Sequence, residues 1–299
     1  MKISKLMLGT VQFGLNYGIA NTEGQPSYAK SRDIISAAFA SGVNCLDTAA
    51  AYGNSEEVIG RALKELGLSA KVLVITKVPI IENLAAKAAE DFIFGSIRNS
   101  MAKLGKDILD GCLFHREDDV KYMDILLKAR DQGLIKKAGI SLDSTAFIDA
   151  VLGSGAEYVQ LPFNILDKRL TSTGFIGKAK SKGMALFSRS VYLQGLLLMS
   201  EEKISEQLKD VIPVRRKLEA LAAEKGMAAA ELYMRFVLTH GEIDSILTGV
   251  DNLEQLRENV RLFSKGPLDS ATMRRIDEIV PLFPEKIVRP GCWERWRKK

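Results

Sequence analysis

The chain has 299 residues, of which 46% are hydrophobic and 26% charged, as in a globular protein that buries its core without cross-links. The net charge of +5 is spread along the sequence, and no basic stripe with interleaved aromatic residues indicates nucleic-acid binding. Three cysteines without CxxC or CxxxC spacing argue against a disulfide framework and a structural zinc site. Because no signal peptide or long apolar run is present, we expect a cytoplasmic protein with no membrane partner.

Eight short apolar segments recur along the chain and are predicted to form strands. In chain order they are KLMLGT, VNCLDTA, KVLVITKV, ILDGCLFH, KKAGISL, YVQLPFN, MALFSRSV and DSILTGV. Each is rich in leucine or β-branched residues and is apolar on both faces. This pattern is typical of strands that are buried on both sides of a parallel sheet.

Segments with helical periodicity separate these strands. We predict helices over residues 30–41, 54–66, 84–104, 119–132, 144–152, 171–182, 214–225 and 253–263. Eight alternating strands and helices predict an α/β fold, a single-domain (β/α)8 TIM barrel over residues 1–299. A doubly wound sheet is the competing parallel fold, but LGTVQFG does not match its glycine fingerprint G-x-G-x-x-G. Residues 191–212 and 264–299 are predicted to be irregular segments that cover the substrate end.

Polar side chains close several of the predicted strands. Asp47 ends the second strand, with Tyr52 in the following loop, while Lys77 ends the third and His115 the fourth. The next three strands end in further polar residues: Ser141, Gln160, Asn164, Ser188, Arg189 and Ser190. Catalysis in a TIM barrel takes place at the carboxyl ends of the strands. Taken singly, the first four could be a helix cap, a packed loop aromatic, a surface lysine and a core histidine, but one shared site explains all four together.

These four side chains form a chemically coherent set. A phenol has an ordinary pKa near ~10, too high for ready proton exchange at neutral pH. We expect the Lys77 ammonium to lower the pKa of Tyr52, and the Asp47 carboxylate to keep Lys77 charged and oriented. The His115 imidazole can bind a carbonyl oxygen and help deliver the proton. The set can protonate the alkoxide that forms when hydride reaches a carbonyl, and a nicotinamide would have to supply that hydride.

The motifs LDTAAAYG, VITK and CLFH, at this spacing, resemble those of the aldo-keto reductases, single-domain TIM-barrel enzymes that use NADP(H). The resemblance runs from MLGT to LRENV, over nearly the whole chain. It implies that Tyr52 is the general acid of a carbonyl reduction. It further implies that Lys77 and Asp47 tune this acid and that His115 orients the carbonyl.

The resemblance also implies a cofactor site for NADP(H). The residues that it assigns to this site are Thr10, Ser141, Gln160, Phe187, Ser188, Gly249, Gln255, Arg257, Glu258 and Asn259. Gln160 would contact the nicotinamide carboxamide and Phe187 would stack on its ring, whereas Leu142 replaces the asparagine of the family. RSVYLQGLL, from Arg189 to Leu197, resembles the loop over the pyrophosphate. Arg257 is the candidate partner of the 2′-phosphate, with a solvated helix arginine as the alternative, so NAD(H) is not excluded.

The substrate is expected to be a small carbonyl compound. Phe13, Asn16, Tyr17 and Trp293 are the candidate pocket residues, and a polar and aromatic mouth would suit a sugar-like or hydroxylated carbonyl. Trp293 has an alternative role as an anchor that packs the tail onto the barrel. Two other functions stay open: a Lys77 Schiff-base aldolase or isomerase, and a regulatory barrel that binds nicotinamide for a partner. We expect no metal, and a monomer or homo-oligomer.

Overall fold

A computed structural model of the chain describes residues 1–19, 21 and 24–293. Eight parallel strands form a closed barrel in the order of the sequence. The barrel closes where β1 pairs with β8, with Leu6 opposite Ile246. The predicted (β/α)8 fold is therefore confirmed. The strands are β1 (Leu6–Gly9), β2 (Cys45–Asp47), β3 (Leu73–Val78), β4 (Gly111–Phe114), β5 (Ala138–Ser141), β6 (Tyr158–Pro162), β7 (Ala185–Arg189) and β8 (Ser245–Gly249).

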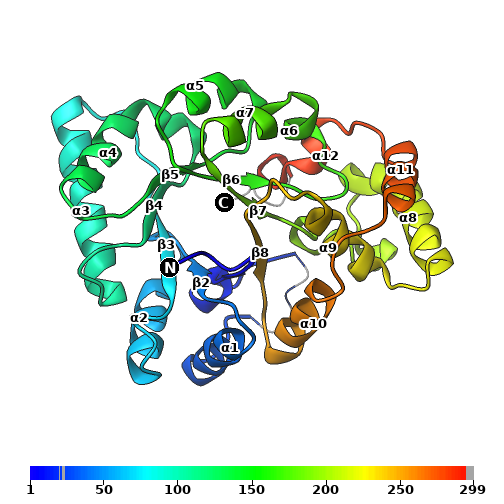
Figure 1. The fold of residues 1–299 in the computed structure, drawn as a ribbon, viewed down its shortest axis with the longest axis horizontal. Coiled ribbons are helices and arrows are strands. Elements are labelled where there is room, and N and C mark those ends of the chain that lie inside the picture. The colour runs from blue at the N-terminus through cyan, green and yellow to red at the C-terminus, as the bar shows by residue number, and fades with distance from the viewer. Residues whose placement is uncertain (20, 22–23, 294–299) are drawn as a thin grey trace.

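Helices surround the strands in a ring (Figure 1). They are α1 (Tyr28–Ala40), α2 (Ser55–Glu65), α3 (Ala86–Leu104), α4 (Met123–Asp131), α5 (Ile148–Gly153), α6 (Arg169–Ser172), α7 (Phe175–Ser181), α8 (Ile212–Glu224), α9 (Ala229–Thr239), α10 (Leu253–Phe263), α11 (Ser270–Ile279) and α12 (Glu285–Val288). Within the described ranges, none of them has the length and apolar character that a membrane span requires.

The strands bury side chains on both faces, which explains their continuous apolar sequences. Successive side chains of a strand point to opposite faces. One face packs against the helices in the main core, as Leu186 of β7 does. The other face fills the barrel interior with a smaller cluster that contains Met7, Cys45, Ile75, Leu113 and Phe187. The lower barrel is thus filled with side chains, and polar residues can gather only at its upper rim.

Local signals in the sequence fix several helix ends. Ser27 accepts a hydrogen bond from the Lys30 backbone at the start of α1, and Asn252 accepts one from Gln255 at the start of α10. Side chains of this kind satisfy N–H groups that have no partner inside the helix. Helix α3 ends at Gly105 in the left-handed conformation, with φ of 62°, the usual role of glycine at a helix end.

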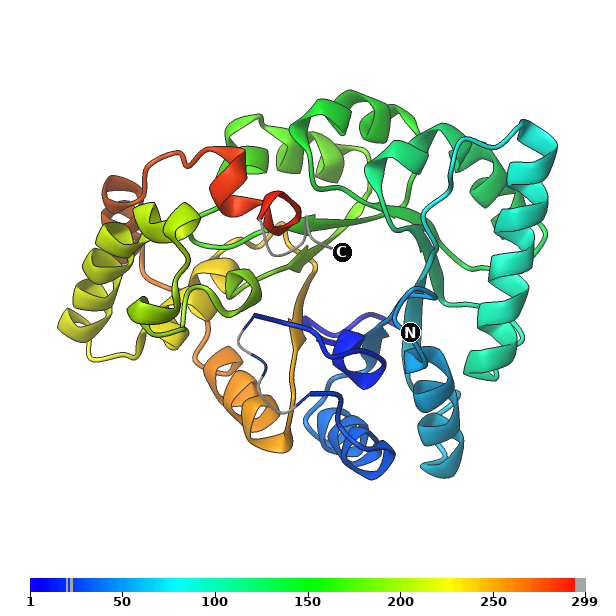
Figure 2. The same cartoon turned by 180° about the vertical axis from the view of Figure 1, so that it is seen from behind.

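Two parts of the chain differ from the sequence prediction. The connection from β7 to β8 contains a second helix, α9, which packs against α8. It was not predicted from the sequence, although Glu231, Arg235 and Thr239 recur at helical spacing beside its buried residues. Residues 264–299 were predicted to be irregular, but α11 begins there at an Asp269 cap. The short helix α12 packs against the 3-10 helix Glu206–Val211, which is part of the connection between β7 and α8 (Figure 2). Residues 191–212 are irregular as predicted, with short 3-10 helices and turns.

Candidate active site

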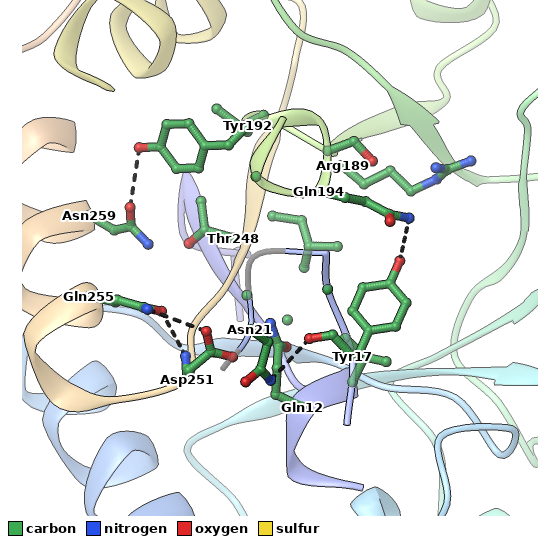
Figure 3. A pocket seen from close by; sticks show the side chains of 18 of the residues that line it. Gln12, Tyr17, Asn21, Arg189, Tyr192, Gln194, Thr248, Asp251, Gln255 and Asn259 are labelled. Carbon is green, nitrogen blue, oxygen red and sulfur yellow. Dashed lines mark hydrogen bonds between the residues drawn. The ribbon is translucent and has the colours of Figure 1, made fainter. Parts of the chain in front are cut away.

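A cavity of about 920 Å³ lies at the carboxyl ends of the strands (Figure 3). Its lining runs from Asp47 and His115, past Gln160 and Arg189, to Gly249 at the end of β8 and on to α10. Cavities of this size typically hold a ligand of the size of a drug or cofactor. The barrel thus gathers residues from most of its strand ends around one space, as the sequence predicted.

A buried ion pair forms the base of the site. The ammonium of Lys77 lies 2.7 Å from both carboxylate oxygens of Asp47 and donates to the Thr48 carbonyl oxygen at 2.9 Å. Both side chains are almost fully buried, with exposed fractions of 1% and 3%. Burial lowers the pKa of Lys77, and Asp47 opposes this effect. A buried charge is tolerated where it is paired and hydrogen-bonded in this way.

Tyr52 and His115 lie above this ion pair at the cavity wall. Their rings meet edge to face, with centroids 5.4 Å apart, and the Lys77 ammonium lies 5.3 Å from the Tyr52 ring centroid. The structure therefore brings together Asp47, Tyr52, Lys77 and His115, the four residues predicted from their positions at or after strand ends. That they are catalytic remains a prediction at this point.

Two glycines fix the backbone that carries Tyr52. A Cβ on Gly14 would lie 1.7 Å from the Tyr52 carbonyl oxygen, and one on Gly53 would lie 2.3 Å from the Gly14 carbonyl oxygen. Gly53 also has a φ of 54°, in the left-handed region that favours glycine. The loops after β1 and β2 therefore touch through backbone alone, and Tyr52 is placed by this close approach.

The pKa of Tyr52 differs from the sequence expectation. Burial and then the charge of Asp47 raise this pKa above its ordinary value, and Arg189 opposes them. The predicted lowering by Lys77 is therefore wrong for this structure. The physical reason is that the ammonium of Lys77 is matched by a carboxylate 2.7 Å away, so little net positive charge reaches the phenol. Tyr52 stays protonated at neutral pH and can only donate a proton.

His115 is a neutral imidazole in this environment. Burial, and after it the charges of Lys77 and Arg189, lower its pKa from 6.5 to about 3. Its Nδ1 atom is buried and has no hydrogen-bond partner among the described residues. A buried polar atom normally has a partner. The unpartnered Nδ1 is closed off from the cavity, so only the rest of the ring, which lines the cavity, is open to a ligand.

We expect this histidine to make the folded state sensitive to acid. Between pH 6.5 and about 3 the unfolded chain binds a proton that the native His115 does not. The stability that His115 contributes is therefore present above pH 6.5 and is lost as the pH falls. Relative to His115→Gln, the wild type should lose about 2 kcal/mol of unfolding free energy between pH 7 and 5. Urea unfolding of both proteins at several pH values measures this difference, and parallel curves would contradict it.

Most of the predicted cofactor residues line the cavity. These are Thr10, Ser141, Gln160, Gly249, Gln255, Arg257, Glu258 and Asn259. Gln160 also has a contact that the sequence did not suggest, because its amide nitrogen donates to Asp47 at 2.7 Å. Its amide oxygen is left for another partner. Cofactor binding by this group of residues stays a prediction.

The two predicted cofactor residues on β7 do not reach the cavity. Phe187 is fully buried in the barrel interior, edge to face with Tyr158 at 4.9 Å. Ser188 is fully buried too, and alternation along the strand directs it to the helix side. The alternation places the next inward-facing side chain two residues after Phe187, so Arg189 occupies the cavity wall in its place.

Three of the four predicted substrate-pocket residues also lie elsewhere. Phe13 is fully buried in the main core, and Asn16 is exposed outside the cavity. Trp293 is 3% exposed, and its indole nitrogen donates to the Ile287 carbonyl oxygen at 3.1 Å. It anchors the last described residues of the chain in the main core, which agrees with the alternative role given above. Only Tyr17 of this group lines the cavity.

The segment after β7 contributes side chains that the sequence analysis did not assign. The Tyr192 hydroxyl bonds the Asn259 side chain at 3.2 Å, and Gln194 donates to the Tyr17 hydroxyl at 2.9 Å. These bonds connect the loop to α10 on one side and to the loop after β1 on the other, as Figure 3 shows. Three residues of the segment, Ser190, Leu193 and Gln194, have positive φ without being glycine, a strain that clusters at functional sites.

Comparison with known proteins identifies the family to which this barrel belongs. The model of the aldo/keto reductase family matches residues 5–281. The chain is an aldo-keto reductase by family. It is 24% identical to the aldo-keto reductase YhdN of Bacillus subtilis, over 97% of this chain and 96% of that protein. It is also 24% identical to the NADH-specific methylglyoxal reductase of Escherichia coli, over 82% of this chain and 87% of that one.

The likeness extends to solved structures. An aldo-keto reductase of Bacillus halodurans in its holo form superposes with a TM-score of 0.77 at 19% sequence identity, covering 99% of this chain and 95% of that one. Aldo-keto reductases act on small carbonyl compounds with nicotinamide cofactors. The family thus agrees with the fold and with the class of chemistry expected from the strand ends.

The cavity of this aldo-keto reductase fits an extended dinucleotide. It reaches from Tyr52 to Arg257 on α10, and the N-terminus of a helix attracts negatively charged groups such as phosphate. At Gly249 a Cβ would lie 2.8 Å from the Gln12 side chain, so glycine allows Gln12 to lie against the end of β8 in the cavity wall. In the described ranges, no group of His, Cys, Asp and Glu residues is arranged to hold a metal ion.

Proposed function

We propose that this protein catalyses the NAD(P)H-dependent reduction of an aldehyde or ketone to the alcohol, with Tyr52 as general acid. The observation that carries the proposal is the meeting of Tyr52, His115, Lys77 and Asp47 at one end of a cavity of dinucleotide size. The family of the chain supports the same reaction class. The substrate in this proposal is a small carbonyl compound.

Three residues of the chain act on the carbonyl group or on the proton that it receives. A bound reduced nicotinamide supplies hydride to the carbonyl carbon. Tyr52 gives its phenolic proton to the carbonyl oxygen, so the product is the alcohol, and the phenolate regains a proton from solvent. His115, neutral and part of the cavity lining, holds the carbonyl oxygen by a hydrogen bond. Lys77 lies 5.3 Å from the ring centroid but is paired with Asp47. Arg189, which opposes the raised pKa of Tyr52, is the cation that favours the phenolate as it forms.

A Schiff-base role for Lys77 receives no support from its surroundings. Its ammonium makes three hydrogen bonds within the protein and it is not among the residues that line the cavity. A lysine nucleophile needs a neutral amine in contact with the substrate. Borohydride trapping in the presence of methylglyoxal is expected to leave the protein unmodified at Lys77.

We further propose that Arg257 binds the 2′-phosphate of NADPH. It lines the cavity on the exposed side of α10 and, within the described part of the chain, it forms no ion pair. Its neighbour Arg261 is held by two hydrogen bonds of 2.7 Å to Glu258. A guanidinium without a partner is the better phosphate ligand. Asp251, Glu254 and Glu258 also line this end, so we expect NADH to bind as well.

A fluorescence titration with NADPH and with NADH tests this proposal first. The wild type should bind both, with NADPH the tighter ligand. Arg257→Gln should weaken NADPH binding roughly tenfold and leave NADH binding nearly unchanged. Arg261→Gln is the matched control, because its guanidinium is already paired with Glu258. Equal affinities in the wild type would remove the phosphate assignment, and no binding of either nucleotide would overturn the reductase proposal itself.

A further inference from the structure

The last residue of β7 places a positive charge inside the mouth of the barrel. Arg189 lines the cavity with a side chain that is 22% exposed, on the same inward face of the strand as Phe187. In Figure 3 its guanidinium lies on the side of Tyr17 and Gln194, well away from Asn259 on α10. Arg189 therefore belongs to the part of the cavity that is remote from α10, where the 2′-phosphate of the nucleotide is placed.

Within the described part of the chain, only one nitrogen of the Arg189 guanidinium donates a hydrogen bond to a protein group. Its Nη2 donates to the Asp143 carboxylate at 2.9 Å, and the other oxygen of Asp143 accepts from Arg289 at 2.6 Å. Burial acts to raise the pKa of Asp143, but the two guanidinium groups outweigh it and hold that pKa below its ordinary value. Arg289 also contacts Glu117 and Glu285, which do not line the cavity. Among the described residues, Asp143 is the sole partner of Arg189, so Nε and Nη1 keep their N–H donors for a ligand.

Among the residues that the structure describes, no other positively charged side chain lines this end of the cavity. Asp47 is neutralised by Lys77 and bonded by Gln160, and the remaining carboxylates of the cavity lining stand on or before α10. The charge of Arg189 reaches the reacting groups, since it acts on the pKa of Tyr52 and on that of His115. A substrate held between these two rings therefore lies within the field of one guanidinium.

We propose that Arg189 binds a carboxylate carried by the substrate, so that the preferred substrates are small carbonyl compounds with an acid group. This inference rests on the reductase function proposed above and names its substrate class. A planar guanidinium matches a carboxylate in shape and donor geometry. A single cation that is shared with Asp143 suits a monoanion better than a phosphate dianion. The carboxylate takes no part in the reaction, and its binding turns the carbonyl oxygen toward Tyr52 and His115.

The test compares matched pairs of anionic and neutral aldehydes. Succinic semialdehyde is paired with butanal, and glyoxylate with methylglyoxal, in assays of NADPH oxidation. In the wild type we expect kcat/KM to be at least tenfold higher for the anionic member of one pair. In Arg189→Gln this ratio should fall by roughly tenfold to a hundredfold, mainly through KM. Ratios are compared because the loss of Arg189 also changes the field at Tyr52 and His115.

Two further variants separate anion binding from a structural role. Asp143→Asn removes the carboxylate that competes for Arg189 and should raise the preference for the anionic substrate. Arg289→Gln removes the other guanidinium on Asp143 without touching the cavity. Asp143 is then balanced by Arg189 alone, so the preference for the anionic substrate should fall. If Arg189→Gln does not fold, inhibition of the wild type by succinate, set against the neutral diol butane-1,4-diol, decides the question.

The outcomes are distinguishable. Equal kcat/KM values within both pairs in the wild type would overturn the anion proposal while the reductase function stands. The same holds if Arg189→Gln lowers both members of a pair alike and weakens NADPH binding, because the guanidinium would then serve the cofactor. If the wild type binds nucleotide and reduces none of the four aldehydes, the proposed function itself fails.

Discussion

Tyr52→Phe is expected to lower the turnover of any carbonyl substrate by roughly a hundredfold to ten-thousandfold, while the dissociation constant of NADPH stays nearly unchanged. The substitution removes one hydroxyl and keeps the ring that packs edge to face against His115 at 5.4 Å. It takes away the phenolic proton that the alkoxide needs, and the raised pKa of Tyr52 means that this proton is present throughout the neutral range. Single-turnover rates and a nucleotide titration measure the two effects separately.

The matched control for this substitution is Tyr17→Phe. Tyr17 is a second phenol in the lining of the cavity, and its hydroxyl accepts a hydrogen bond from Gln194 at 2.9 Å. Its loss should change kcat far less than the loss of the Tyr52 hydroxyl does. Similar reductions in kcat for the two variants, or full turnover in Tyr52→Phe, would contradict the role of Tyr52 as the acid.

Gly14→Ala is expected to lower kcat by roughly tenfold to a hundredfold, although Gly14 has no functional group. The new methyl would lie 1.7 Å from the Tyr52 carbonyl oxygen and 2.7 Å from the Ser55 backbone nitrogen. Backbone cannot yield as a flexible side chain can, so the loop that carries Tyr52 must move, and displacement of a catalytic group by about 1 Å can cost a factor near 100. We also expect a loss of about 1–3 kcal/mol in the unfolding free energy from overpacking.

Gly95→Ala serves as the control for this second prediction. Gly95 lies inside α3, and a Cβ there meets nothing within 4 Å. Alanine is favoured over glycine in a helix, so this variant should be at least as stable as the wild type and equally active. Steady-state kinetics and thermal unfolding of both variants make the comparison. Wild-type kcat in Gly14→Ala would show that the loop adapts without moving the Tyr52 hydroxyl.

The sequence by itself determined the repeating architecture and the position of the reacting groups along the chain. Short strands that are apolar on both faces require cover on both sides, which a barrel ringed by helices provides. In such a barrel every strand end faces the same rim, so Asp47, Lys77 and His115 had to converge there once the strands were known. Helix α9 was nevertheless not predicted, although its Glu231 and Arg235 lie one helical turn apart and form an ion pair.

Only the tertiary structure decided the electrostatics of the site. Lys77 was expected to lower the pKa of Tyr52, yet that pKa is raised. The direction of this pKa shift depends on burial and on the 2.7 Å contact between Lys77 and Asp47. A sequence motif specifies neither the burial of a side chain nor such a distance. The 1.7 Å approach at Gly14 is likewise a property of two loops in space.

The sequence also did not predict which residues line the cavity at the end remote from α10. Phe187 and Trp293 were expected at the cavity and lie in the core, whereas Arg189, two residues from Phe187, lines the cavity. Every second side chain of a strand points into the barrel. If the prediction chooses the wrong one of two successive inward-pointing residues, it assigns the wrong chemical group to the ligand. A strand pattern fixes which face is buried, but the depth of each side chain along the barrel depends on how all eight strands are staggered.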